Sequence, residues 1–303
     1  MKRSYRLSIE ICDKEKPESA LGILLPIPPM TPHQQLHRMR MDPTWSVGRF
    51  AETNGQQSAY FATFPDRAWT RPFTFDLSEG GRMVADHFAA SKSRFKDPGA
   101  DARELAAGLN LDGDDSEGEK LLRIVECVGQ KFKYQSGYDN DEPLTCDLLT
   151  GNCLSINSAV MRLAQLADVS FAYYIGFFFR DDRSLTADDW HCWIATLTER
   201  GYESWDIAHQ LRRGGGERVG AGLNPISGTR FAMSVGQDLV FNLPFAKVEV
   251  PHLCSPRWIF PDGRSQRSAV RVALEPIDIG STRGVDPVEL SKTLESAGSH
   301  AIN

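Results

Sequence analysis

Residues 150–210 carry the pattern that most restricts how this chain can fold. Apolar residues recur at helical spacing across 153–166, and the aromatic run "FAYYIGFFF" (171–179) that follows is typical of a strand. Residues 191–208 then form two strand-like segments joined by the turn "ERG" (199–201). One helix followed by a strand and a hairpin predicts an antiparallel sheet with helices packed on it, which is an α+β fold.

The rest of the chain divides into a strand-rich beginning and a helical middle. Alternating or apolar runs such as "YRLSIEI", "LGILLPI" and "QSAYFATF" predict an N-terminal β-rich domain over residues 1–78. Helical patterns follow at 81–95, 101–109 and 117–134. We therefore expect a core over residues 79–280, which includes the strand-like segments after 238, and a flexible tail over 281–303.

Charge and composition exclude several classes of protein. The net charge of −6 and pI of about 5.7 argue against a nucleic-acid surface. The start lacks a signal-peptide core and the longest early apolar run is too short to span a membrane. The six cysteines have no disulfide-scaffold spacing, so we expect free thiols and a cytoplasmic protein. Residues 112–123 have Glu117 and Arg123 at the glycine and glutamate positions of a calcium loop, so they predict a solvated loop before a helix.

Cys153 stands where the helix of residues 153–166 is expected to begin. A thiol of ordinary pKa is only a few per cent ionised at neutral pH, so a nucleophilic cysteine needs help from its surroundings. Thr150 or Asn152 can cap the helix, and backbone N–H groups of the first turn then point at the sulfur. This position predicts a nucleophile, with a buried structural thiol as the alternative.

His191 and Asp206 lie in the two strands of the expected hairpin. If they share a face of the sheet, Asp206 accepts a hydrogen bond from one imidazole nitrogen and leaves the other for Cys153. The sequence does not fix the register, and a slip of one residue would change the face. Trp190 and Trp193 flank His191 and are expected to exclude water from the pair.

The order of these motifs resembles the transglutaminase-like core of the papain-type cysteine enzymes. There, Gly-x-Cys begins a helix, His-x-Trp opens a strand, and an aromatic residue followed by x-x-x-Asp closes the next. The matching residues here are Gly151-Asn152-Cys153, His191-Cys192-Trp193 and Tyr202-Glu203-Ser204-Trp205-Asp206. The match covers residues 130–210, and the β-rich start is similar to bacterial members with an N-terminal β domain. Cys192 departs from the family, which usually has a small apolar residue after the histidine.

The resemblance implies a papain-like core in which Cys153 is the nucleophile, His191 the general base and acid, and Asp206 the orienting residue. Such enzymes form a thioester and pass the acyl group from a carrier-bound or peptide donor to an amine or to water. The Cys153 N–H is expected to stabilise the oxyanion, with Tyr134 or Gln135 as a second donor. This chemistry requires no metal or organic cofactor.

Four functions remain open from the sequence. Acyl transfer to an amine leads, and a thiol protease or amidase keeps the same triad with water as acceptor. An arylamine N-acetyltransferase shares the triad order, although its cysteine lies much nearer the start of the chain. A binding module that has kept the fold and lost the chemistry is the fourth.

Other polar residues near these motifs have simpler interpretations. Cys192 and His209 are expected to be packing residues, or in the case of His209 a surface residue. His252 and Cys254 lack a second pair at metal-ligand spacing, which argues against a zinc site. The glycine- and arginine-rich segment 212–228 is either an ordinary loop or a flap that meets an anionic acyl carrier.

Overall fold

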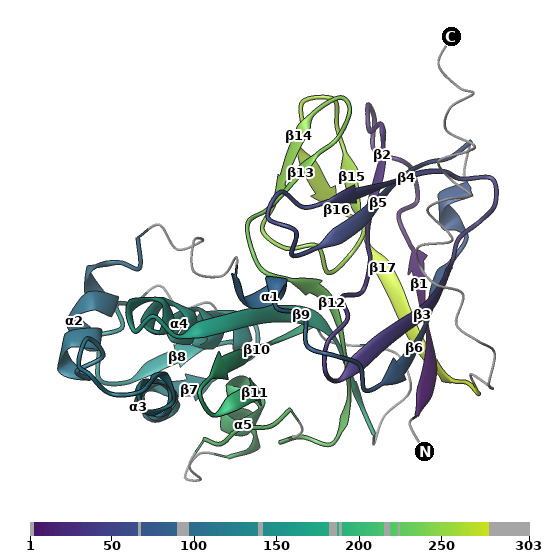
Figure 1. Ribbon diagram of the computed structural model, residues 1–303. Helices are drawn as coiled ribbons and strands as arrows, with labels where there is room; N and C mark the ends of the chain where they lie inside the picture. Colours follow the sequence, from purple (N-terminus) through teal and green to yellow (C-terminus); the bar gives the residue numbers. More distant parts are fainter. Residues whose placement is uncertain are drawn as a thin grey trace. The chain divides into compact units, whose positions relative to one another are not determined.

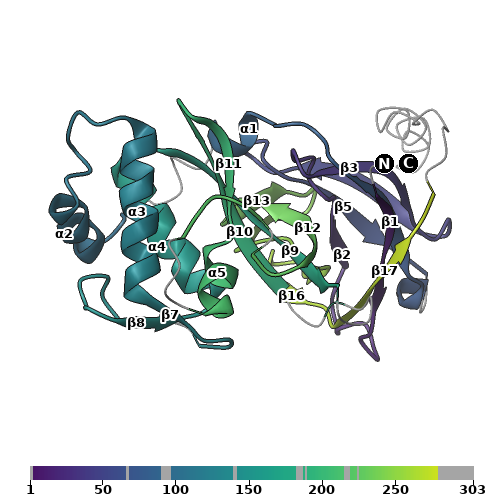
Figure 2. The same cartoon turned by 90° about the horizontal axis from the view of Figure 1, so that it is seen from below.

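The structure is a computed structural model of the chain, and it divides the chain into two compact units (Figure 1, Figure 2). It describes residues 3–65, 68–89, 97–138, 142–181, 187, 190–214, 219–223 and 225–278. The first unit combines residues 1–84, 177–189 and 230–303, and the second combines residues 85–176 and 190–229. The expected tail over 281–303 lies outside the described residues.

The first unit is built mainly from two antiparallel sheets. One has the strand order β17-β1-β6-β3 and the other the order β16-β15-β2-β5-β4, with a separate β13-β14 hairpin. The strands before the second unit are β1 (Ser4–Ile11), β2 (Gly22–Pro26), β3 (Gln34–Arg40), β4 (Ser46–Ala51), β5 (Ser58–Thr63) and β6 (Phe73–Glu79), with the 3-10 helix η1 (Ala68–Thr70). Those after it are β12 (Gly228–Val235), β13 (Leu239–Asn242), β14 (Lys247–Val250), β15 (Arg257–Ile259), β16 (Ser265–Arg267) and β17 (Val270–Pro276).

The second unit carries the helices and the candidate site. Its elements are α1 (Asp86–Ala89), α2 (Ala100–Gly108), α3 (Glu117–Lys131), β7 (Phe132–Tyr134), β8 (Leu149–Gly151), α4 (Cys153–Leu166), β9 (Ser170–Arg180), β10 (Trp190–Thr198), β11 (Gly201–Trp205) and α5 (Ile207–Arg213). The strands β11, β10 and β9 are neighbours in its sheet in that order, and β7 pairs with β8 in parallel. Helix α4 contacts α2, α3, α5 and β10, so it is the central element of the unit (Figure 2).

Local sequence signals account for most of these elements. The side chains of β1 alternate between buried and half-buried, as its sequence predicts for a strand with one face in the core. Helix α3 begins with a capping box, in which Ser116 binds the Glu119 N–H and Glu119 binds the Ser116 N–H. This cap confirms that the acidic stretch is a loop leading into a helix.

The boundaries of the two units differ from the predicted domains. The sequence predicts a core over residues 79–280, but β17 pairs with β1 and β15 pairs with β2, so the last strands belong with the first. Two buried glutamines help to join them. Gln34 binds both the N–H and the C=O of Ala232, and Gln57 binds the Met233 C=O and the Val235 N–H. These side chains supply hydrogen bonds that a neighbouring strand would otherwise make, which hydrophobic periodicity cannot reveal.

Two further elements differ from their sequence predictions. Only Asp86–Ala89 of the expected helix at 81–95 is helical among the described residues, and 90–96 lie outside them. Asp206, expected within a strand, follows β11 directly and caps α5, because its carboxylate accepts a hydrogen bond from the His209 N–H.

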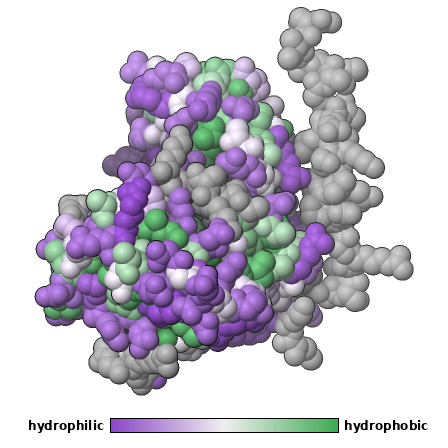
Figure 3. Space-filling view, turned by 60° about the vertical axis from the view of Figure 1, so that its left-hand side comes forward, coloured by the Kyte–Doolittle hydropathy of each residue, from purple (hydrophilic) through white to green (hydrophobic). Residues whose placement is uncertain are grey.

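Within the part of the chain that the structure describes, few large apolar side chains are exposed. The face seen in Figure 3 is mostly hydrophilic with scattered hydrophobic spots. Among the residues that the structure describes, no helix combines the length and the apolar character needed to cross a bilayer.

We expect Gln34→Met to lower the free energy of unfolding by about 3 kcal/mol, because it leaves buried backbone groups of Pro29 and Ala232 without partners. Urea unfolding followed by tryptophan fluorescence measures the change. Gln35→Met is the matched control, since Gln35 is only half-buried, and we expect it to change stability by less than about 0.5 kcal/mol. Equal losses in the two variants would contradict the role of Gln34.

Candidate active site

Cys153 is the first residue of α4, and Asn152 caps the helix. The Asn152 Oδ1 accepts hydrogen bonds from the N–H groups of Leu154 at 2.8 Å and Ser155 at 3.1 Å. The parallel pairing of β7 with β8 fixes the approach to the helix, with Tyr134 opposite Gly151. The cysteine is half-buried, and it is the first residue of a 14-residue helix, whose N-terminus carries partial positive charge.

The register of the β10–β11 hairpin places His191 and Asp206 on one face. Ile194 pairs with Trp205, so the next position along, Asp206, comes opposite Trp193. His191 lies two residues before Trp193 and therefore on the same face of the strand. The His191 Nε2–H donates to the Asp206 Oδ1 at 2.8 Å, and the two side chains are 2% and 0% exposed. This bond leaves the Nδ1 of His191 as the ring nitrogen that can pair with Cys153.

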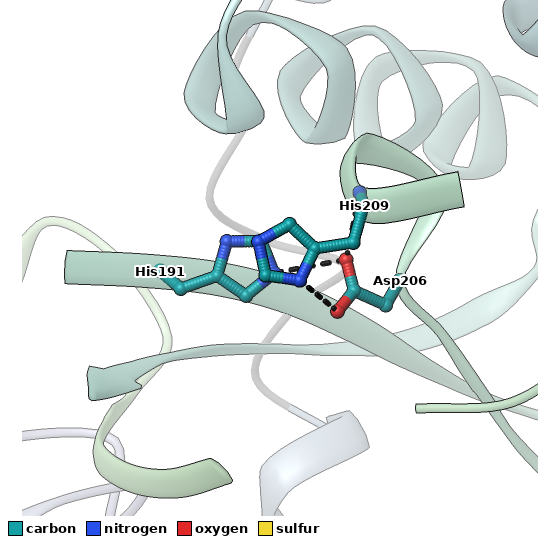
Figure 4. A group of neighbouring side chains, drawn as sticks. All are labelled: His191, Asp206 and His209. Atoms are coloured by element: carbon teal, nitrogen blue, oxygen red, sulfur yellow. Dashed lines mark hydrogen bonds and ion pairs between the residues drawn. The ribbon is translucent and has the colours of Figure 1, made fainter. Parts of the chain in front are cut away.

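His209 lies in the same buried group (Figure 4). Its Nδ1 lies 3.2 Å from the Asp206 Oδ2, and its backbone N–H donates to the Asp206 Oδ1 at 3.1 Å. The rings of His209 and His191 are stacked, with centroids 3.6 Å apart and planes 6° from parallel. The sequence predicted a surface or packing residue here. The structure buries His209 and gives both its ring and its backbone a partner in the site.

The stacked rings limit how much charge the group can hold. Two positive charges at this separation repel by about 5 kcal/mol at an effective dielectric constant of 20. Asp206 and Cys153 both stabilise a positive charge on His191, so we expect His191 to be the charged ring of the stack. A neutral His209 that keeps its proton on Nδ1 can donate to Asp206 while His191 carries the charge.

His191, Asp206 and His209 also offer three ligand atoms within 4.8 Å of one another, which raises the question of a metal site. A histidine binds a zinc ion through a lone pair in the plane of its ring, at about 2.0–2.1 Å. The two rings are nearly parallel and 3.6 Å apart, so these lone pairs do not converge on one point. The stacking therefore favours a hydrogen-bonded carboxylate over a bound ion.

Cys153 and His191 have pKa values that favour an ion pair. A hydrogen bond from the Cys192 side chain, and then the hydrogen bond and charge of His191, lower the pKa of Cys153 to about 4 although burial opposes ionisation. Burial acts to lower the pKa of His191, but the charge and hydrogen bond of Asp206, with those of Cys153, raise the pKa to about 9. Between these values the pair is a thiolate beside an imidazolium.

Cys192 and Asn157 are two neighbours whose roles the sequence did not indicate. The Asn157 Nδ2 donates to the Cys153 carbonyl at 2.9 Å, to the Cys192 carbonyl at 3.1 Å and to the Cys192 Sγ at 3.3 Å. This amide ties the first turn of α4 to β10. Burial, and then the hydrogen bond to Cys153, raise the pKa of Cys192 well above its ordinary value, so Cys192 keeps its proton and donates it. Cys192 was expected to be a packing residue, and it also contacts the candidate nucleophile.

The other predicted site residues, Trp190, Trp193, Tyr134 and Gln135, differ in how far their side chains are exposed. Trp193 is buried, and its ring centroid lies 6.2 Å from that of His191, whereas Trp190 is half-buried. The Tyr134 ring faces the Arg212 guanidinium at 5.8 Å. The exposed Gln135 donates its backbone N–H to the Gly151 carbonyl, which places it beside the loop before Cys153.

Exposed apolar side chains occur close to Cys153 in the chain. Leu154, the next residue, is 43% exposed, and Leu148, just before β8, is 66% exposed. Tyr138 is also exposed, and its carbonyl accepts the Asn152 N–H at 2.9 Å. The segments that lead into α4 therefore present apolar surface.

A second cysteine–histidine pair lies in the first unit. The Cys254 Sγ and the His252 Nδ1 are 3.0 Å apart, close enough for a hydrogen bond. Burial raises the pKa of Cys254 to about 12, and burial with the charges of Arg257 and Arg267 lowers the pKa of His252 to about 4. This pair is therefore neutral, in contrast to Cys153 and His191.

Comparison with known proteins identifies a fold without identifying a family. Neither a protein-family model nor a curated protein matches the chain. A candidate cysteine protease from Cytophaga hutchinsonii has a similar structure, with a TM-score of 0.51 and 12% identity over 93% of each chain. A candidate protease from Parabacteroides distasonis gives a TM-score of only 0.28 at 13% identity, over 61% of this chain and 42% of that one. The first likeness shows that this α+β fold is shared with a protein named as a cysteine protease.

We expect Cys153 to react with iodoacetamide at pH 6 about threefold to tenfold faster than an ordinary thiol, because it is already ionised there, although a thiolate of low pKa is less nucleophilic. The rate should rise through an inflection near pH 4, and peptide mass mapping can follow each cysteine. Cys254 is the internal control and should stay unmodified, because its pKa is raised to about 12. In His191→Ala the inflection should move upward, and an unchanged profile would contradict the ion pair.

We expect Cys192→Ala to raise the pKa of Cys153 by about one unit, because the variant removes a hydrogen bond to the thiolate. The same alkylation profile measures the shift. Cys192→Ser keeps a donor at this position and should stay close to wild type. If both variants match wild type, Cys192 is a packing residue only.

Proposed function

We propose that the protein is a cysteine enzyme that carries an acyl group as a thioester on Cys153 and passes it to an amine. The observation that carries this proposal is a half-buried cysteine at a helix N-terminus, with its pKa lowered, and a histidine in the same unit that is bound to a buried carboxylate. Nucleophile, base and orienting residue come from α4, β10 and the end of β11. The order of the motifs supports a transglutaminase-like core of the papain type.

In the proposed reaction, the Cys153 thiolate attacks the carbonyl carbon of the donor and forms a carbon–sulfur bond. The His191 imidazolium gives its proton to the leaving group as the tetrahedral intermediate collapses to the thioester. The acceptor amine then attacks the thioester carbonyl, and His191 takes a proton from it. Collapse of the second intermediate releases the amide and restores the thiolate. Asp206 holds the imidazole in the tautomer that both steps need.

The oxyanion of each tetrahedral intermediate requires hydrogen-bond donors that point at its oxygen. We propose the Cys153 N–H as one donor, because it belongs to the first turn of α4. Tyr134 and Gln135 remain the candidates for a second donor. The pairing of β7 with β8, and the bond from Gln135 to Gly151, support this part of the proposal.

An apolar acyl donor fits the surroundings of Cys153. Leu148 and Leu154 are exposed next to the helix start, and buried Trp193 lies beside His191. Apolar surroundings around a thioester favour attack by an amine that is held in place over attack by bulk water.

Hydrolysis is the second candidate, in which water replaces the amine and the protein is a thiol protease or amidase. The structural neighbour from Cytophaga hutchinsonii is named as a candidate cysteine protease, which favours this alternative. Both candidates use the same acyl-enzyme, and they differ only in the acceptor.

The experiment supplies peptide p-nitroanilides and acyl thioesters as donors, with dansylcadaverine as the amine, and separates transfer from hydrolysis products by mass spectrometry. We expect an acyl adduct on Cys153 and a dansyl amide as product. Asp206→Asn should lower the rate by on the order of 10³-fold, because the imidazole loses its orientation. Cys153→Ala should abolish the adduct.

Cys254→Ala is the matched control and should keep wild-type activity, since Cys254 lies in the first unit. Hydrolysis alone across a panel of amines would contradict transfer and support the protease. Turnover by Cys153→Ala would contradict both.

A further inference from the structure

We propose that His209 is a positioning residue of this site, which holds the second oxygen of Asp206 and covers one face of the His191 ring. This inference deepens the proposed function and rests on it. The sequence motifs that suggested Cys153, His191 and Asp206 do not include His209. Its assignment comes from the geometry of α5 alone (Figure 4).

The first step of the argument concerns the Asp206 carboxylate. The Oδ1 accepts bonds from the His191 Nε2–H and the His209 backbone N–H, whereas the Oδ2 lies 3.2 Å from the His209 Nδ1. A carboxylate held at both oxygens cannot rotate away from His191 without breaking a bond. His209 therefore fixes the direction in which Asp206 faces.

The second step concerns the His191 ring. Its stacking on His209, with centroids 3.6 Å apart, leaves it little freedom to tilt out of the plane that reaches Asp206. Trp193 lies on the same face of β10, with its ring inclined at 26° to that of His191. His191 is thus held by the hydrogen bond from its Nε2 to Asp206 and by the aromatic rings of His209 and Trp193 beside it.

The third step concerns charge. The titratable groups around His191 are Asp206 and His209 at the start of α5, Cys153 on α4, and Cys192 next to it on β10. Arg212, also on α5, lies over the Tyr134 ring. A second cation stacked on His191 would oppose its charge, so His209 acts in its neutral form with the proton on Nδ1.

Two variants separate the hydrogen bond from the ring. His209→Phe keeps a flat side chain and removes the donor, and His209→Asn keeps a donor near the Nδ1 position and removes the ring. We expect His209→Phe to move the acid inflection of Cys153 alkylation up by about one unit, because Asp206 no longer holds His191 as firmly, and so to slow alkylation at pH 4 by about twofold to fivefold. His209→Asn should recover part of the wild-type rate.

His252→Phe is the control, since it replaces another histidine that contacts a cysteine, and it should leave the Cys153 profile unchanged. Thermal unfolding verifies that each variant is folded. If His209→Phe does not fold, the comparison of His209→Asn with wild type carries the test. A folded His209→Phe that retains the wild-type profile would overturn the inference and leave the proposed function standing.

Nitrogen NMR of the histidine side chains supplies a test that does not depend on alkylation. Wild type at pH 6 should show His191 as imidazolium and His209 as the neutral form with its proton on Nδ1. A charged His209, or stoichiometric binding of Zn²⁺ that is lost in His209→Asn, would overturn the inference. A Cys153 that is unreactive in wild type and insensitive to His191→Ala would instead contradict the proposed function.

Discussion

The buried carboxylate of Asp206 is the interaction on which the candidate site depends. It receives hydrogen bonds from a strand histidine, a helix histidine and a backbone N–H, and it has no exposed surface. Burying a charge without partners costs several kcal/mol. The buried carboxylate is therefore stable only while the two histidines and the backbone N–H donate hydrogen bonds to it. The charge of His191, and through it the ionisation of Cys153, follows from that requirement.

A comparison of the two cysteine–histidine pairs shows what the carboxylate contributes. Cys254 and His252 are within hydrogen-bond distance, yet burial keeps both neutral, and their nearby charges are arginines. Cys153 and His191 have the opposite charge state because a protonated Cys192 and then His191 stabilise the thiolate, while Asp206 stabilises the imidazolium. Proximity of a thiol and an imidazole is therefore insufficient, and the third group decides their ionisation.

Local sequence patterns predicted individual helices and strands better than they predicted which strands pair with one another. The capped start of α4, the amphipathic α3 and the hairpin after β9 all follow from spacing and turn residues within a few positions of each other. The return of β17 to β1 could not be predicted, because strand pairing over this distance leaves no local signal. The bonds of Gln34 and Gln57 to β12 were equally hidden from the sequence, since hydrophobic periodicity does not show them. His209 was missed for a similar reason, since its role requires the short helix that Asp206 caps.

The pairing of β1 with β17 has a consequence for the order in which the protein is made. The ribosome synthesises β1 first and β17 some 260 residues later. At ordinary rates of translation, the interval between the two strands is roughly 15 to 50 s. The whole second unit leaves the ribosome within that interval. We therefore expect the unit with Cys153 to fold first, while the edge of β1 that later pairs with β17 is still unpaired.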